Sequence, residues 1–239
     1  MNLDQKGFYW AYTEYTTDQQ KEQNAQYIYQ KLITTTWNQG ISGTIPMTAW
    51  TLNAIAGLLG NMEAESQINP GLYAGRIMSP NRAFGLVQWW PGSKYINWAN
   101  GIPVADYDID YQLARLYYEE NQPGGSSDHA WYIETRPAKL EGWGPYSLSE
   151  AQFWVSTQTP EWLGQAWLFN YERPDRPARY ANYRGRLARK WYNFLTDNPD
   201  PDPDPPDPGP PGPGQKNLIW WLWKMYNNNN PGRVDIPYV

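Results

Sequence analysis

The stretch GLLGNMEAESQINPGLY, residues 57–73, places acidic side chains where a helix favours them least. An apolar run from Leu52 to Met62 indicates a helix. Glu63 and Glu65 follow near its end, and the turn residues Asn69-Pro70-Gly71 stop it. The C-terminal end of a helix carries partial negative charge, so a carboxylate there is unfavourable. An acid in this position therefore needs a chemical or structural reason.

Glu65 continues the apolar stripe of this expected helix. Ala54, Leu58 and Glu65 fall on one face at spacings of four and seven, whereas Glu63 is expected to point to solvent. A carboxyl group that is partly removed from water holds its proton more tightly, as a general acid near neutral pH requires. We therefore predict that Glu65 is a catalytic acid. Side chains suited to lining a sugar cleft follow it, namely Tyr73, Gln88, Trp89 and Trp90.

The composition excludes several kinds of site. There are no cysteines, so disulfides and thiolate metal sites are ruled out. His129 is the only histidine, which argues against a histidine zinc site or a Ser-His-Asp triad. No phosphate-binding loop or calcium motif is present, so we expect no metal and no cofactor. The net charge of −5 argues against nucleic acid as a partner. The polar start of the chain does not resemble a signal peptide.

A proline-rich segment, DNPDPDPDPPDPGPPGPG at residues 197–214, marks the clearest boundary in the chain. Alternating proline and aspartate favour an extended polyproline II spacer over a packed core. Its five aspartates account for the whole net charge of −5. We therefore expect an N-terminal arm at 1–18, a folded domain at 19–196, this linker, and an aromatic tail at 215–239.

The folded domain is expected to be predominantly helical, an α+β fold with one small β region. Periodicity and start signals predict six helices. They are Gln19–Trp37, Ala49–Ser66 after a Thr48 cap, Ile109–Asn121, a helix to Thr157 with a Ser147/Glu150 capping box, Pro160–Tyr171 after Thr159, and Pro177–Leu195. The glycine-containing stretch Ala74–Trp90 predicts a small hairpin or an irregular strand pair.

Three motifs, NAIAGLLGNMEAESQINPGLY, AFGLVQW and FNYERPD, closely resemble the tail-associated lysozymes of phages that infect Gram-positive bacteria. The similarity covers residues 19–196. It implies a lysozyme-like fold, with a hairpin region after the catalytic helix, and cleavage of peptidoglycan glycan strands. Matching the motifs implies that Glu65 is the catalytic acid and that the cleft is formed at Ser66, Gly85, Gln88 and Trp89. The same matching implies a structural role for the YERP motif at 171–174.

The second carboxylate that many glycosidases use is missing from its expected place. Residues 66–105 contain no Asp or Glu. In one alternative, Glu65 acts alone and the acetamido or 6-hydroxyl group of the sugar attacks the anomeric carbon, as in a lytic transglycosylase. In the other, an acid from elsewhere activates water, with Asp106, Asp108 and Asp110 as candidates. The alternative interpretation of these three aspartates is structural: they lie in a loop that ends in a helix cap.

The expected function is that of a virion-associated peptidoglycan hydrolase that opens the bacterial wall locally during genome ejection. Some relatives carry a zinc peptidase domain after the linker. We expect no such domain in this sequence, because only 25 residues follow the linker and the chain has one histidine. Residues 215–239, which include IWWLWKMY, are expected to bind other tail or ejection proteins; folding back on the domain and membrane contact are the alternatives. A structural tail protein that binds peptidoglycan and a free endolysin are the competing functions.

Overall fold

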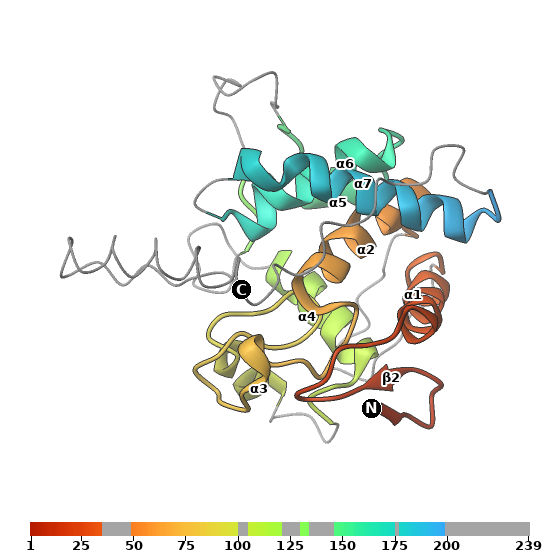
Figure 1. The fold of residues 1–239 in the computed structure, drawn as a ribbon. Coiled ribbons are helices and arrows are strands. Elements are labelled where there is room, and N and C mark those ends of the chain that lie inside the picture. Colours follow the sequence, from red (N-terminus) through yellow and green to blue (C-terminus); the bar gives the residue numbers. More distant parts are fainter. Residues whose placement is uncertain (35–48, 100–104, 121–129, 134–145, 175–176, 199–239) are drawn as a thin grey trace, which may run out of the picture. The chain divides into compact units, whose positions relative to one another are not determined.

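The computed structural model describes residues 1–34, 49–99, 105–120, 130–133, 146–174 and 177–198 (Figure 1). The described part is predominantly helical with one small sheet, which confirms the α+β class. The elements in chain order are β1 (Asn2–Leu3), β2 (Tyr9–Trp10), α1 (Asp18–Leu32), α2 (Leu52–Ser66), η1 (Ala74–Arg76), α3 (Ser93–Ala99), α4 (Ile109–Glu120), α5 (Glu150–Trp154), α6 (Pro160–Trp167), η2 (Leu168–Glu172) and α7 (Pro177–Leu195). Residues 199–239, which hold most of the expected linker and the whole tail, lie outside the described residues, and the domain boundaries stay predictions.

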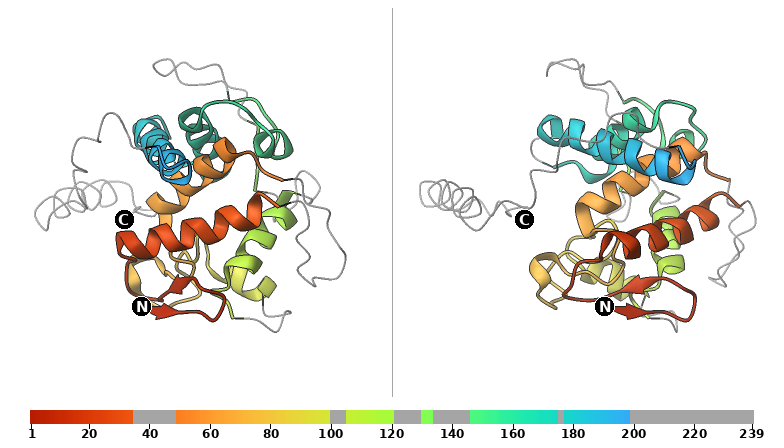
Figure 2. Two further views of the ribbon diagram at one scale, coloured as in Figure 1. Left: turned by 90° about the vertical axis from the view of Figure 1, so that its right-hand side faces the viewer. Right: turned by 45° about the vertical axis from the view of Figure 1, so that its right-hand side comes forward.

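Helix α2 is the central element of the described fold. Helices α6 and α7 pack against it and against each other, and α1 contacts it as well (Figure 2). Gly60 allows the closest approach, because a Cβ atom there would lie 2.6 Å from the backbone nitrogen of Ala188 in α7. Gly164 of α6 is also close to α7, with an added Cβ 2.9 Å from the Cβ of Ala188. Gly60 of the opening stretch therefore determines how near α7 comes to α2.

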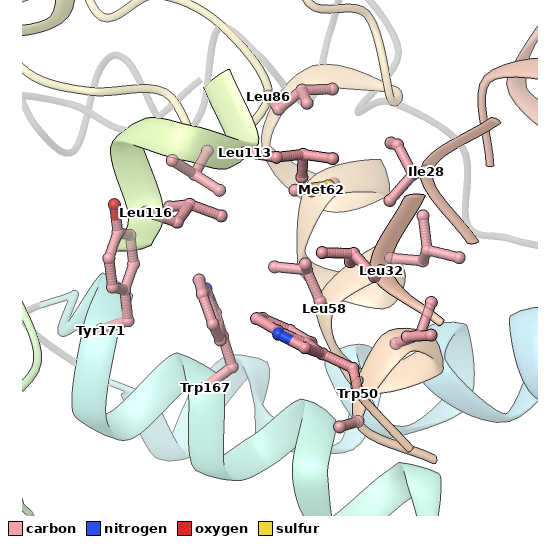
Figure 3. Close-up of a cluster of buried hydrophobic side chains, with 14 of the residues drawn as sticks. Ile28, Leu32, Trp50, Leu58, Met62, Leu86, Leu113, Leu116, Trp167 and Tyr171 are labelled. Carbon is pink, nitrogen blue, oxygen red and sulfur yellow. The ribbon is translucent and has the colours of Figure 1, made fainter. Parts of the chain in front are cut away.

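Large apolar side chains from several elements meet on another side of α2 (Figure 3). Leu58 and Met62 of α2 are fully buried, and Trp167 at the end of α6 is buried beside them. Trp50, just before α2, stacks on Trp154 of α5 with 5.6 Å between the ring centroids. Each such side chain contributes about 1.5–3 kcal/mol on burial. Several of the tryptophans are therefore core residues rather than candidates for sugar binding.

The ends of α2 and α5 differ slightly from the sequence prediction. Thr51 caps α2 by accepting a hydrogen bond from the Ala54 amide, and Thr48 lies outside the described residues. Helix α5 has its capping box at Ser149 and Gln152, two residues after the predicted one, and it ends at Trp154. Equivalent Ser-x-x-acceptor patterns overlap here, so the local sequence does not distinguish them.

The C-terminal helices start where they were predicted, but α6 ends at Trp167 and the π-helix η2 takes the place of its predicted last turn. Thr159 caps α6, with Pro160 at its first position. Helix α7 runs over the predicted range, Pro177–Leu195. Helix α4 is described up to Glu120, and its predicted end, Asn121, lies outside the described residues. Helix α1 ends at Leu32, and its predicted end, Trp37, also lies outside them.

The predicted hairpin at residues 74–90 is wrong in detail. This fully described stretch forms the 3-10 turn η1 and no strand, with isolated β-bridges joining Tyr73 to Phe84 and Phe84 to Trp89. The two-stranded antiparallel sheet is instead in the N-terminal arm, where β1 pairs with β2. Helix α3 follows this stretch and was not predicted. No helix of the described part is long and apolar enough to cross a membrane.

Candidate active site

Glu65 lies one residue before the end of α2, and its carboxylate forms an ion pair with Arg184 of α7. The Glu65 side chain is 12% exposed, so water can reach it. Nη1 of Arg184 also donates to the carbonyl oxygen of Asn61, at 2.8 Å. The guanidinium thus meets both the negative end of the helix and the carboxylate. This explains how α2 tolerates an acid at its C-terminal end.

The expectation that Glu63 points to solvent is wrong. Its carboxylate is buried and accepts hydrogen bonds from Lys21 of α1 at 3.1 Å and from Lys190 of α7 at 2.8 Å. Nε1 of Trp191 donates to it as well, at 2.8 Å. The prediction assumed that α2 has one buried face, but helices enclose it on more than one side. Glu63 therefore ties α1, α2 and α7 together.

A second carboxyl group, that of Glu172, is near enough to Glu65 and Arg184 for their charges to act on it. Glu172 ends the five-residue π-helix η2, which continues α6. Its Oε1 accepts a hydrogen bond from Nε1 of Trp167 at 3.1 Å. Burial raises the pKa of Glu172 well above its ordinary value of 4.5, the negative charge of Glu65 raises this pKa further, and Arg184 lowers it.

Glu172 was not predicted as a site residue, because a second acid was expected near Glu65 along the chain. The available signal was an acid inside the aromatic motif FNYERP, which was interpreted as structural. That interpretation suits Tyr171, whose hydroxyl donates to Glu119 of α4 at 2.7 Å. The carboxyl group of the neighbouring Glu172 accepts from Nε1 of Trp167.

Ser66 and Gly85 hold the stretch after α2 in place. The Ser66 side chain is buried, and its hydroxyl lies 3.0 Å from the carbonyl oxygen of Met62 and 2.9 Å from that of Leu86. Gly85 has a φ of +84°, and a Cβ there would lie 2.8 Å from Oε1 of Gln112. Both residues therefore shape the backbone beside the end of α2, and their contact with substrate stays a prediction.

The other predicted cleft residues make contacts within the protein. Tyr73 packs on Phe84, with 4.6 Å between ring centroids. Nε2 of Gln88 donates to the carbonyl oxygens of Leu72 and Gly85. Trp89 is 5% exposed, and its Nε1 donates to the buried carboxylate of Glu119 at 3.1 Å.

The ring of Trp89 also stacks on Tyr95, with 4.8 Å between the ring centroids. Its neighbour Trp90 is 58% exposed and presents an accessible aromatic surface. Substrate binding by Tyr73, Gln88 and Trp89 stays a prediction.

A family model described as phage tail lysozyme matches residues 41–195, more than half of the sequence. The chain belongs to the phage tail lysozyme family. It is also 35% identical over 148 residues to "Morphogenesis protein 1" of Bacillus phage B103. That match covers 62% of this chain and 36% of the relative, so the chain spans about a third of that protein's length.

In this phage tail lysozyme domain, the aspartates after residue 105 bind the N-terminal arm and α1. Asp106 accepts a hydrogen bond from the Tyr12 hydroxyl at 2.9 Å. Lys6 donates to Asp108 at 2.6 Å and to Asp110 at 3.0 Å. Oδ1 of Asp108 also accepts from the backbone amide of Asp110, which confirms Asp108 as the cap of α4.

These contacts favour the structural interpretation of the three aspartates over water activation. Burial raises the pKa of Asp108, while Lys6 opposes that shift. Within the described ranges of this family member, no group of three or more His, Asp or Glu side chains is placed to hold a metal ion.

Proposed function

We propose that this chain is a peptidoglycan glycosidase of a phage tail and that Glu65 is its catalytic acid. The observation that carries the proposal is a partly exposed carboxyl group at the end of a buried helix, held by Arg184 and accompanied by a second carboxyl group. Membership of the phage tail lysozyme family supports the substrate class. Tertiary contacts keep this acid in a position that helix electrostatics alone disfavours.

In the proposed reaction, Glu65 donates a proton to the glycosidic oxygen while the bond from that oxygen to the anomeric carbon breaks. The sugar develops positive charge, which the anionic site stabilises. Attack by water on the anomeric carbon gives a free reducing end, and Glu65 then accepts a proton from the water. Attack by the 6-hydroxyl group of the same sugar gives an anhydro end instead, with the hydroxyl proton passing to Glu65.

The test is digestion of purified Gram-positive peptidoglycan by the wild type and by Glu65→Gln, with mass spectrometry of the released muropeptides. We expect products from the wild type and a loss of at least ~100-fold for the variant, because the amide cannot donate an acidic proton. Free reducing ends identify a hydrolase, and products one water lighter identify a transglycosylase. Equal product release by both proteins contradicts the role of Glu65.

A structural tail protein that binds peptidoglycan is the second candidate. The name of the relative from phage B103, a morphogenesis protein, favours it. The same digestion separates the two functions when a pull-down on the purified wall is added. Binding by the wild type and by Glu65→Gln, with no products from either, establishes the structural function.

We further propose that the enzyme is carried in the virion and acts on the wall during genome ejection, with residues 215–239 as its attachment to other tail proteins. A tethered enzyme needs little affinity of its own for the wall, since attachment sets its local concentration. A truncation ending at Asn198 should be lost from purified virions while keeping its activity on peptidoglycan. Normal incorporation of the truncated protein refutes the attachment.

A further inference from the structure

The backbone immediately after α2 adopts a conformation that its residues rarely take. Gln67 and Ile68 follow the end of the helix at Ser66, and their φ angles are +57° and +53°. Non-glycine residues are uncommon in this left-handed region, and a β-branched residue such as Ile68 is a genuine outlier there. Such strain persists only where the surrounding structure enforces it, and it clusters at active sites. The strained pair directly follows the end of the helix that carries Glu65.

Hydrogen bonds join this strained turn to the end of α2. The amides of Gln67 and Ile68 donate to carbonyl oxygens near the end of the helix, at 2.9 and 3.2 Å. The amide of Asn69 donates to the carbonyl oxygen of Ser66 at 3.1 Å, and Ser66 is the residue that follows Glu65. The position of the turn and the position of the helix end are therefore linked through the backbone.

Asn69 attaches the N-terminal arm to this turn. Its side chain is fully buried, and its Oδ1 accepts from the amides of Ala11 and Gly71, both at 3.0 Å. Its Nδ2 donates to the carbonyl oxygen of Ala11 at 2.9 Å and to that of Glu14 at 2.7 Å. The side-chain amide thus uses both of its N–H groups and both lone pairs of its oxygen. An aspartate of the same shape would have no N–H group for the two carbonyl oxygens.

Two further buried side chains hold the strained residues themselves. The hydroxyl of Thr16 in the arm donates to the carbonyl oxygen of Gln67. Nδ2 of Asn24 in α1 donates to the carbonyl oxygen of Ile68 at 2.7 Å and to that of Tyr9 in β2 at 2.8 Å. The arm and α1 both lie before residues 41–195, the part of the chain that matches the family model. Segments outside that match therefore enforce the conformation after α2.

We propose that Asn69 and Thr16 are positioning residues for Glu65, through which the N-terminal arm fixes the end of α2 and aims the catalytic carboxyl group. This inference rests on the proposed glycosidase function. Arg184 holds the carboxyl group itself, whereas Asn69 and Thr16 hold the backbone from which it projects. A general acid has to lie within hydrogen-bonding distance of the oxygen that it protonates. A displacement of about 1 Å at the helix end can therefore lower the rate about 100-fold while the other contacts to the substrate remain.

The first test measures kcat and KM on solubilised peptidoglycan strands for the wild type, Thr16→Val and Thr16→Ser. Valine keeps the shape of threonine but leaves the carbonyl oxygen of Gln67 without its donor, whereas serine keeps the hydroxyl. We expect Thr16→Val to lower kcat by about 10- to 100-fold with KM unchanged, and Thr16→Ser to restore most of the rate. Asn69→Asp should lower kcat further, because it removes both N–H groups that bind the arm. The Thr16 variants decide the proposal even where Asn69→Asp does not fold.

The matched control is Thr159→Val, which removes the hydroxyl that caps α6 by accepting from the amide of Trp162 at 3.3 Å. This variant should lose stability, as Thr16→Val does, but keep the kcat of the wild type at temperatures well below its Tm. An unchanged kcat in Thr16→Val, or an equal fall in the control, overturns the proposal.

The second test needs no catalysis. Amide hydrogen exchange is followed by NMR in the wild type and in Thr16→Val. Exchange at Gln67 and Ile68 should become at least about tenfold faster in the variant, because local opening of the turn releases both amides, while exchange at Ala188 of α7 stays the same. Equal rates at Gln67 and Ile68 in the two proteins overturn the proposal. Faster exchange in the variant, with no muropeptides released by the wild type, supports the attachment of the arm to the helix end and refutes the glycosidase function.

Discussion

Replacing Gly60 by alanine tests how close helix packing supports the site. The new Cβ would lie 2.6 Å from the backbone nitrogen of Ala188, 2.9 Å from its Cα and 3.1 Å from the carbonyl oxygen of Arg184. All three atoms belong to the backbone of α7, so the whole helix has to move. Overpacking of this kind costs up to about 3 kcal/mol, and the better helix propensity of alanine returns about 1 kcal/mol.

We therefore expect a net loss of about 2 kcal/mol, which is a fall in Tm of roughly 4–8 °C for a domain of this size. Because Arg184 moves with α7, kcat on peptidoglycan should fall as well, even well below the Tm. The assay is thermal unfolding followed by circular dichroism, together with muropeptide release at 25 °C.

Gly185→Ala is the matched control, a second glycine-to-alanine change within a helix of this bundle. Its Cβ would meet the end of the flexible Gln165 side chain first, at 3.1 Å. This variant should gain up to about 1 kcal/mol from helix propensity. If Gly60→Ala is as stable as Gly185→Ala, the argument that backbone contact sets the distance between α2 and α7 is refuted.

Three further predictions concern charge and exposure. Arg184→Gln should lower kcat, because Glu65 loses the side chain that holds its carboxyl group in place; an unchanged kcat would separate Arg184 from the reaction. The raised pKa of Glu172 gives a stabilising contribution that is complete below pH 4.5 and is lost as the pH rises through the folded-state pKa. Thermal melts from pH 4 to 8 should therefore show the wild type losing stability relative to Glu172→Gln. Trp90→Ala should raise KM with little change in Tm, whereas the buried Trp89→Ala should cost about 3–5 kcal/mol of stability; the opposite pattern would assign the sugar-binding surface to Trp89.

Much of the helical fold could be predicted from the sequence because helix signals are local. Thr159 and Pro160 indicate the start of α6, and apolar periodicity defines α7. The stretch 74–90 could not be predicted as precisely. Its form depends on bonds to distant partners, such as the one from the Leu86 amide to Oε1 of Gln112 at 2.8 Å, and the pattern of glycines does not encode them.

The candidate site could be predicted only in part. Glu65 stood out because an acid at a helix C-terminus conflicts with the helix dipole, and such conflicts tend to mark functional positions. Arg184 did not, since nothing near it in the sequence indicates that it pairs with residue 65. The surroundings of Glu63 were misjudged for a related reason, because one helix taken alone does not reveal how many neighbours enclose it.

The π-turn at Leu168–Glu172 makes the site sensitive to chain length as well as to side-chain identity. A π-turn holds one more residue than the α-helical turn it replaces. Deleting a single residue from this segment would let α6 continue as a regular helix, and every later position in the helix would rotate by about 100°. The carboxyl group of Glu172 would then lose its place beside Nε1 of Trp167. Gaps in this segment should therefore be rarer among active members of the family than substitutions on its outer surface.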